Sequence, residues 1–236
     1  MSTFLELCQD AAREVGIPGV GPVTTINQTG QLGDIVRWVK NSYKEVQNRN
    51  GGHWRFLRHG FTLTTADSDD TYAFGDAVDS TTASAITRFS QWRFADRAAP
   101  PTIYLQSAGV GTQNWLIYSQ WEPFKQIYKI STQVDSYPAH ITVDPQDQIL
   151  LGPVPNGIYV VTGEYWRSAQ ILALDADVPE MPVQFHDLIT WYAIENYGYL
   201  EAAPEVLARA KQKKRTFMRQ LEANQLERFG KARSLA

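Results

Sequence analysis

The sequence predicts an α+β fold in which a helical bundle, built from N- and C-terminal helices, carries an inserted antiparallel β-sandwich or β-barrel domain. Near both ends of the chain, apolar residues recur at three- and four-residue steps, which is the period of an amphipathic helix. Between residues 54 and 166 the pattern changes to short runs rich in Ile, Val, Thr, Tyr and Trp, which is typical of strands. The order of helices, strands and helices favours the insertion of one domain into another.

Two helices are expected before the strands. Thr3 and Glu6 form a capping box at the start of the first helix, and its apolar positions continue until Gly16. A loop dense in Gly, Pro and Thr follows, and Thr29 is the expected cap of the second helix. The second helix has a single apolar stripe and ends at the sequence "NRNGG", whose glycines stop a helix.

Eight or nine short strands are expected in the middle of the chain, separated in most cases by Gly, Pro, Asp or Asn. In chain order the segments are "FTLTT", "TYAF", "ITRFSQWRF", "PTIYLQ", "NWLIYSQ", "FKQIYKI", "HITVD", "QILLG" and "GIYVVTGEYW". Asn156 and Gly157 lie between the last two segments and predict a hairpin turn there. This spacing favours an antiparallel sandwich or a small barrel.

Two more helices are expected after the strands. Pro182 suits the first turn of the third helix, whose apolar face is widened by Trp191, Ile194 and Tyr197. Pro204 begins a fourth helix that carries many basic residues off its apolar stripe. The predicted domains follow from this order. They are a discontinuous helical bundle (1–52 and 178–228), an inserted β-domain (53–177) and a flexible C-terminal tail (229–236).

Composition limits the class of protein. With 43% apolar and 20% charged residues and a net charge of -3, the chain has the composition of a globular protein. Because no run of about 18 apolar residues occurs, we expect neither a membrane span nor a secretory leader. Cys8 is the single cysteine, which fits a protein made in a reducing cytoplasm. From residue 201 onward, nine Lys or Arg stand against four Asp or Glu, so an acidic body precedes a basic end.

No pattern of a metal, cofactor or catalytic site is found in the sequence. The four histidines lack the close spacing of zinc ligands, and no phosphate-binding loop or nucleophile motif is present. His186 and Asp187 form a His-Asp pair within the third expected helix, but no further residue completes a catalytic set. An Asp near a helix start is favoured by the helix dipole. We therefore expect no catalytic residue, no cofactor and no metal, and interpret this helix as a packing surface.

Two other classes of function stay open at the level of the residues. The paired acids in residues 67–70 and 144–147, with the Trp side chains as stacking surfaces, suit a carbohydrate-binding or glycan-hydrolysing domain. Polar turns, in which Asp accepts backbone hydrogen bonds, explain the same acids. The basic fourth helix suits contact with DNA or an acidic partner, or else a solvated helix face.

Two long stretches resemble the head-to-tail adaptor, or connector, proteins of tailed bacteriophages, including podovirus neck ring proteins related to tail tubular protein A. The first runs from Thr3 to Arg58 and includes "GIPGVGPVTTINQTG" and "WRFLR". The second runs from Ile149 to Val206 and includes "PEMPVQFHDLITWYAIENYG". The order and spacing of these motifs carry the resemblance, which is looser between the two stretches.

The resemblance implies a structural virion protein without a reaction. Such proteins form a homo-oligomeric ring, commonly a dodecamer, beneath the portal, where the ring extends the DNA ejection channel and provides the tail attachment surface. The implied partners are further copies of the chain, the portal protein, a downstream tail or nozzle protein, and genomic DNA that passes through the lumen non-specifically, with no membrane. The implied location is the virion neck, after synthesis in the host cytoplasm. The alternative is a glycan-binding or glycan-hydrolysing β-domain protein of the phage tail.

Candidate interface residues follow from the ring that the resemblance implies. Contacts in a closed ring are heterologous, and aromatic and Arg side chains concentrate binding energy at such contacts. The candidates for subunit or portal contacts are Arg37, Trp38, Tyr43, Trp191, Tyr192, Tyr197 and Phe217. The candidates for portal or DNA contacts are Arg209, Lys211, Lys213, Lys214, Arg215, Arg219 and Arg228.

Overall fold

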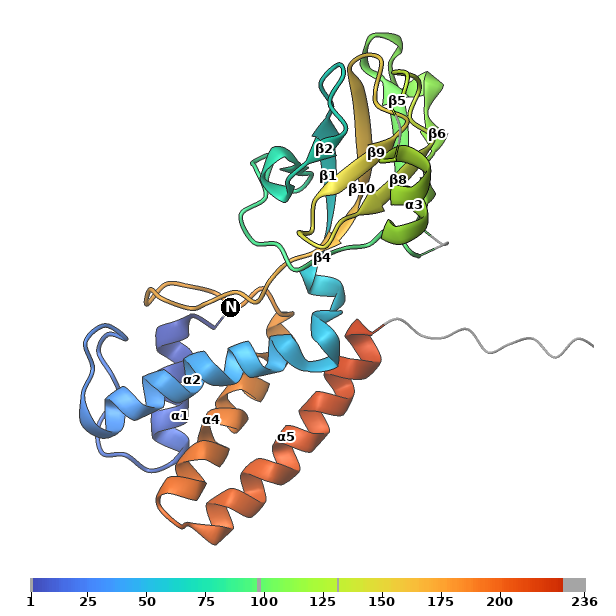
Figure 1. The fold of residues 1–236 in the computed structure, drawn as a ribbon. Coiled ribbons are helices and arrows are strands. Elements are labelled where there is room, and N and C mark those ends of the chain that lie inside the picture. Colours follow the sequence, from blue (N-terminus) through green and yellow to red (C-terminus); the bar gives the residue numbers. More distant parts are fainter. Residues whose placement is uncertain (1, 97–98, 131, 227–236) are drawn as a thin grey trace, which may run out of the picture. The chain divides into compact units, whose positions relative to one another are not determined.

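The computed structural model describes residues 2–96, 99–130 and 132–226, which form two compact units (Figure 1). The helical unit comprises Met1–Leu57 and Ala169–Ala236, and the β unit comprises Arg58–Ser168. The chain therefore leaves the helical unit once, builds the β unit and returns. This arrangement confirms the predicted α+β class. The expected tail, residues 229–236, lies outside the described residues.

Four α-helices make up the described part of the helical unit, with short 3-10 helices beside two of them. The α-helices are α1 (Phe4–Glu14), α2 (Gly30–Asn48), α4 (His186–Leu200) and α5 (Pro204–Gln225). The 3-10 helices are η1 (Arg49–Gly52), η2 (Arg55–Leu57) and η6 (Val183–Phe185). The helix expected to begin near Pro182 therefore starts as a 3-10 turn and becomes α-helical at His186.

Local sequence signals set the helix ends. The Glu6 backbone N–H donates to Thr3 Oγ1 at 3.2 Å and the Thr3 N–H donates to Glu6 Oε2 at 2.8 Å, so the predicted capping box is confirmed. Thr29 precedes α2, but its side chain accepts no capping hydrogen bond. After α2, Asn50 and Gly51 adopt φ values of 52° and 68°. These left-handed conformations are not helical, so they end the helix.

Helix α4 lies at the centre of the helical unit. Figure 1 shows α1 and α5 on two sides of it, and α2 also packs against it. Its buried side chains point in several directions around the helix axis, as expected for a helix that is apolar on nearly every face. They include Leu188, Ile189, Tyr192, Ala193 and Ile194. Three neighbouring helices are therefore needed to cover α4.

A hydrogen-bond network attaches residues 169–182 to the helical unit. Gln47 is fully buried, and its side chain accepts from the Gln170 N–H at 2.7 Å and donates to the Gln170 carbonyl at 3.0 Å. The Tyr43 hydroxyl donates to Gln170 Oε1 and accepts from the Glu180 N–H, both at 2.9 Å. The helical unit of the structure therefore begins again at Ala169, whereas the boundary predicted from the sequence was residue 178, where the helical period returns.

The β unit contains two sheets. The first has the order β3-β1-β10-β5-β6, with β4 also paired to β10, and the second has the order β2-β9-β8-β7. All pairs are antiparallel except β7 and β8, which are parallel. The first sheet consists of β1 (Arg58–Thr64), β3 (Val78–Asp79), β4 (Gln91–Trp92), β5 (Thr102–Leu105), β6 (Asn114–Trp115) and β10 (Tyr159–Trp166). The second consists of β2 (Thr71–Tyr72), β7 (Ile117–Tyr118), β8 (His140–Val143) and β9 (Ile149–Gly152).

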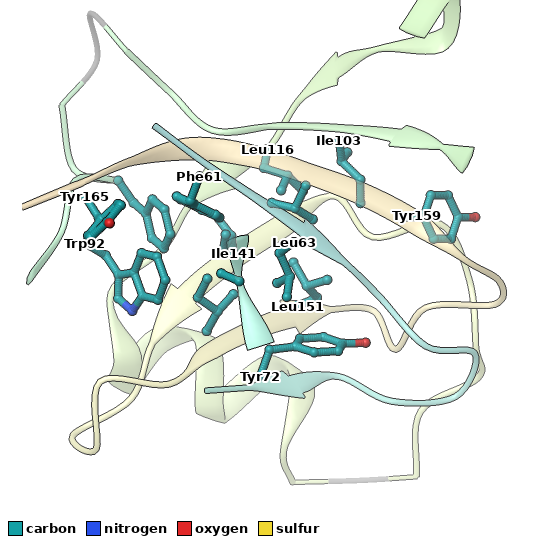
Figure 2. Close-up of a cluster of buried hydrophobic side chains, with 14 of the residues drawn as sticks. Phe61, Leu63, Tyr72, Trp92, Ile103, Leu116, Ile141, Leu151, Tyr159 and Tyr165 are labelled. Carbon is teal, nitrogen blue, oxygen red and sulfur yellow. The ribbon is translucent and has the colours of Figure 1, made fainter. Parts of the chain in front are cut away.

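One apolar core joins the two sheets, so the β unit is a sandwich (Figure 2). The first sheet contributes Phe61, Leu63 and Tyr165, and the second contributes Ile141 and Leu151, all of which are buried. Alternate residues of β1 point into this core, as the two-residue period of a strand requires. Short connections complete the unit: η3 (Phe74–Asp76), η4 (Gln106–Ala108), η5 (Val110–Thr112) and α3 (Trp121–Tyr128).

Two predictions for the β unit are wrong. The segment "FKQIYKI" was expected as a strand but lies largely in α3, where Phe124 and Tyr128 are one helical turn apart and cover the second sheet. The Tyr128 hydroxyl lies 2.8 Å from His140 Nδ1 on β8. The Asn156–Gly157 turn does not close a hairpin, because β9 and β10 belong to different sheets and the turn crosses between them.

We predict that Gly163→Ala destabilises the β unit by about 1–3 kcal/mol, because overpacking a filled core forces neighbouring side chains to move. A Cβ at residue 163 would lie 2.8 Å from the Phe61 ring, which is itself buried against Trp92. Urea denaturation followed by hydrogen exchange of β-unit amides measures the loss. Gly75→Ala is the matched control, since a Cβ there meets no atom within 4 Å. Equal stability of the two variants would contradict the packing described here.

Candidate assembly interface

The described residues hold no group placed to bind a metal ion, and the single cysteine is buried. No group of three or more His, Cys, Asp or Glu in residues 2–96, 99–130 and 132–226 is placed to hold a metal ion. Cys8 is fully buried, and burial together with the nearby Asp175 carboxylate raises the pKa of its thiol to about 12. The thiol therefore stays protonated at neutral pH and acts as a small apolar core residue.

Two of the acids considered for glycan hydrolysis bond within their own turns, and a third, Asp70, pairs with Lys129 at 2.6 Å. Asp144 accepts hydrogen bonds from the backbone N–H groups of Gln146 and Gln148, at 2.9 and 2.8 Å. Asp69 accepts from the Thr71 N–H at 3.2 Å. Such local bonds are the ordinary role of Asp in polar turns, as the sequence predicted.

The Trp side chains considered as stacking surfaces are mostly buried. Trp54, Trp92 and Trp166 lie in the two cores, and the Trp54 indole donates to the Val46 carbonyl at 3.0 Å. Trp115 on β6 is 68% exposed, and Trp121 at the start of α3 is half-buried. Among the tryptophans of the described β unit, only these last two therefore offer surface for stacking on a sugar ring.

The candidate aromatic contacts divide into buried and accessible residues. Tyr43 and Tyr192 are core residues, with at most 2% of their surface exposed. Trp38 and Tyr197 are half-buried and pack edge to face, with ring centroids 6.3 Å apart. Phe217 is also half-buried.

Arg37, the remaining candidate of this group, is exposed on α2. Its guanidinium bonds to Asp34 at 2.7 Å, and its side chain stays 64% accessible. An exposed ion pair of this kind contributes at most about 1 kcal/mol, so it leaves the guanidinium free to exchange partners. Arg37 therefore fits an interface role better than Tyr43 does.

Most of the basic residues of α5 pack on the aromatic rings of α4. Arg209 and Lys213 lie over Trp191, 5.4 and 6.0 Å from the ring centroid, and Lys214 lies 4.2 Å above Tyr192. Lys211 lies over Tyr199 in the same way.

Two of these cations also form ion pairs. Arg209 pairs with Glu14 at 2.7 Å, and Lys214 pairs with Glu195. These cations stabilise the packing of α5 on α4. Arg228 lies outside the described residues.

A groove on one flank of α5, here called the basic groove, gathers four cations. Arg49, Lys214, Arg215 and Arg219 surround a floor of Tyr192 and Met218, and Glu222 is the one acid of the lining. The volume of the groove is about 300 Å³.

A second groove lies between α1 and α4 and is here called the acidic groove. Asp10, Glu14 and Asp187 line it with Arg13, Thr190 and Trp191, around a volume of about 230 Å³. Asp10 and Arg13 are bonded at 2.9 Å. Sequence reasoning missed both grooves. Asp10 and Glu14 lie one turn apart on the polar face of α1, and nothing distinguishes that pattern from any solvated helix.

Two loops of the helical unit, here called the paired loops (residues 16–29 and 169–182), present apolar side chains to solvent on a firmly bonded backbone. Thr25 donates its backbone N–H and its hydroxyl to Asp175 Oδ1, at 2.6 and 2.5 Å, which lowers the pKa of that carboxyl. The Phe4 N–H donates to the Asp177 carbonyl at 2.7 Å, so the second loop also caps α1. The exposed apolar residues are Val20, Val23, Ile26, Ile171 and Leu174.

His186 is a buried core residue. Its ring is 1% exposed, and Nε2 donates to the Met181 carbonyl at 2.9 Å. Among the residues described, Nδ1 has no hydrogen-bond partner. Burial holds the pKa of His186 below its ordinary value, so the neutral ring is the form that the fold accepts.

We predict that acidification destabilises the helical unit through His186. Because the folded pKa lies below the unfolded value of about 6.5, stability is complete above that value and falls as the pH drops below it, with a limiting slope of about 1.4 kcal/mol per pH unit. Thermal unfolding between pH 7.5 and 5 measures the effect. His186→Gln should unfold at lower temperature but with a weaker pH dependence, whereas His53→Gln, at an exposed histidine, should keep the dependence of the unmodified chain. An unchanged pH dependence in His186→Gln would contradict the assignment.

Comparison with known proteins agrees with a structural role. No helix in the described part of the chain is long and apolar enough to span a membrane. A search of curated proteins gives no match. The family model of the SU10 adaptor proteins matches residues 2–234, and this match confirms the resemblance to phage head-to-tail adaptors. The chain therefore belongs to the SU10 adaptor protein family, a family of structural phage proteins.

Proposed function

We propose that this adaptor forms a homo-oligomeric ring, with twelve subunits expected, beneath the portal protein in the neck of the virion. The ring extends the DNA ejection channel and offers the surface to which the downstream tail protein attaches. The observation that carries the proposal is the set of exposed apolar side chains on the paired loops, because apolar residues that gather on an exposed surface commonly mark a protein contact site. Val23, 82% exposed, is the clearest case.

The hydrogen bonds beneath the paired loops support an assembly surface. Apolar residues on a loosely held loop lose conformational entropy when a partner orders them, which weakens binding. Here Thr25, Asp175 and Asp177 already fix both loops, so that cost is largely met in the free subunit. A partner protein then gains most of the free energy of apolar burial.

The β unit also presents apolar side chains to solvent. They lie on β6, on β7, in the turns next to them and at the end of α3, and include Val110, Trp115, Ile117, Ile127, Ile130 and Val134. Strands β6 and β7 are the last strands of their sheets, so their free edges also offer unpaired backbone groups. These features support a second protein contact, for which the tail protein is the proposed partner.

The charges of the chain suit a DNA conduit better than a DNA-binding site. Non-specific affinity for DNA rises with the number of cations that neutralise phosphates. In α5, Arg209 and Lys214 are paired with acids, and Lys211 and Lys213 lie over aromatic rings. With a net charge of -3, the chain holds passing DNA weakly.

Mass photometry of the purified chain, alone and with the portal protein of the same phage, tests the ring. We expect the mass of the portal complex to increase by that of twelve 26.6 kDa chains, about 320 kDa. Val23→Asp, which places a charge on the exposed paired loops, should lower ring formation without altering thermal unfolding of the free chain. Monomers alone and no added mass on the portal would contradict the proposal.

A glycan-binding β unit of the phage tail is the second candidate, because Trp115 is 68% exposed. Under the proposal above, we expect the unmodified chain to bind no glycan on an array. Binding that Trp115→Ala abolishes and Ile117→Ala retains would favour the second candidate instead. Ile117 is the matched control, because it is an exposed apolar residue on the neighbouring strand β7.

A further inference from the structure

The acidic groove contains one carboxylate, that of Asp187, which no ion pair within the described residues neutralises. Arg13 bonds to Asp10, and Glu14 is paired with Arg209, but Asp187 has no hydrogen bond or ion pair among the described residues. Burial raises the pKa of Asp10, Arg13 lowers it, and the Asp187, Glu6 and Glu14 carboxylates raise it further. An incoming cation would relieve this repulsion between carboxylates.

The basic groove has an excess of positive charge. Arg215 and Arg219 are exposed, lie one helical turn apart and have no hydrogen-bond or ion-pair partner in the part of the chain that the structure describes. Like charges at this spacing repel each other along a helix. Arg49 and Lys214 lie over the Tyr192 ring, 5.6 and 4.2 Å from its centroid, so the groove has a firm aromatic floor. An acidic partner would bind here with little rearrangement.

The two grooves open on different faces of the helical unit. Trp191 lines the acidic groove and Tyr192 the basic groove, and consecutive helical residues point about 100° apart. On α5, Arg209 reaches toward the acidic groove, whereas Arg215 and Met218 line the basic groove. The basic residues of one groove therefore cannot contact the acidic residues of the other within a single chain, but they can do so in a second copy.

We propose that the surface around the basic groove of one copy binds the surface around the acidic groove of the next. Arg215 and Arg219 then lie against Asp10 and Asp187 of the neighbouring subunit. The inference rests on the ring proposed above and names the contact that closes it. A repeated contact between two different patches is heterologous, which is the geometry of a cyclic ring. DNA phosphates would account for the basic groove alone. A second copy accounts for both grooves.

Charge reversal on the full-length chain tests the contact. Arg215→Glu with Arg219→Glu makes both grooves acidic, and Asp10→Lys with Asp187→Lys makes both basic. We expect each double variant alone to require at least roughly 100-fold more protein for ring formation on the portal, because like charges then meet. An equimolar mixture of the two should restore the ring, since acidic and basic subunits can alternate. Mass photometry at two salt concentrations measures ring formation.

The matched control is Lys40→Glu with Lys44→Glu, which reverses two exposed cations of α2 that line neither groove and should assemble as the unmodified chain does. Circular dichroism melting confirms that every variant is folded. If the unmodified chain forms a ring and the reversals do not weaken it, this contact is overturned while the ring proposal stands. The contact is also overturned, and the ring proposal stands, if the variant Arg215→Glu with Arg219→Glu still forms the ring and loses only its binding to a DNA duplex. If the unmodified chain adds no ring to the portal, both are overturned.

Discussion

Burial of α4 is the constraint on which the helical unit depends. A helix that is apolar on nearly every face cannot lie on a surface, so α1, α2 and α5 must each cover a part of it. Close approach of α5 is possible because Gly198 has no side chain. A Cβ there would lie 3.2 Å from the Leu207 nitrogen. The acidic groove then lies between α1 and α4, and the basic groove lies where α5 meets Tyr192 of α4 and Arg49 at the end of α2.

The basic residues of α5 show how one set of side chains serves stability and assembly at once. Those that face α4 lie on Trp191, Tyr192 and Tyr199, where cation–π contacts stabilise the helix pair. Arg215 and Arg219 are exposed and line the basic groove, which is the proposed contact with a neighbouring subunit. The charge of this helix is therefore mostly part of its packing, and only a fraction of it is left for recognition.

The fold was largely predictable wherever local rules act. The Thr3 capping box, the Pro204 helix start and the change from a helical to a strand period are properties of neighbouring residues, and all three agree with the structure. The failures came where a distant contact decided. "FKQIYKI" has the composition of a strand, but Phe124 and Tyr128 cover a sheet that forms from other parts of the chain. Asn156 and Gly157 form a turn, as their residue types predict. Whether such a turn closes a hairpin or joins two sheets depends on which strands pair with β9 and β10.

The sequence by itself determined that helices flank a β region, that no catalytic motif is present and that the chain resembles phage adaptors, because period, spacing and motif order can be read along the chain. Only the tertiary structure decided which candidate residues have a surface. Tyr43 and Arg37 lie on one helix, yet Tyr43 is buried against residues 169–182 and Arg37 is exposed. The grooves also required the fold, since Asp10 and Asp187 meet only when α1 packs on α4. A helix period shows which residues share a face, but the neighbour that covers that face is set by packing across long stretches of chain.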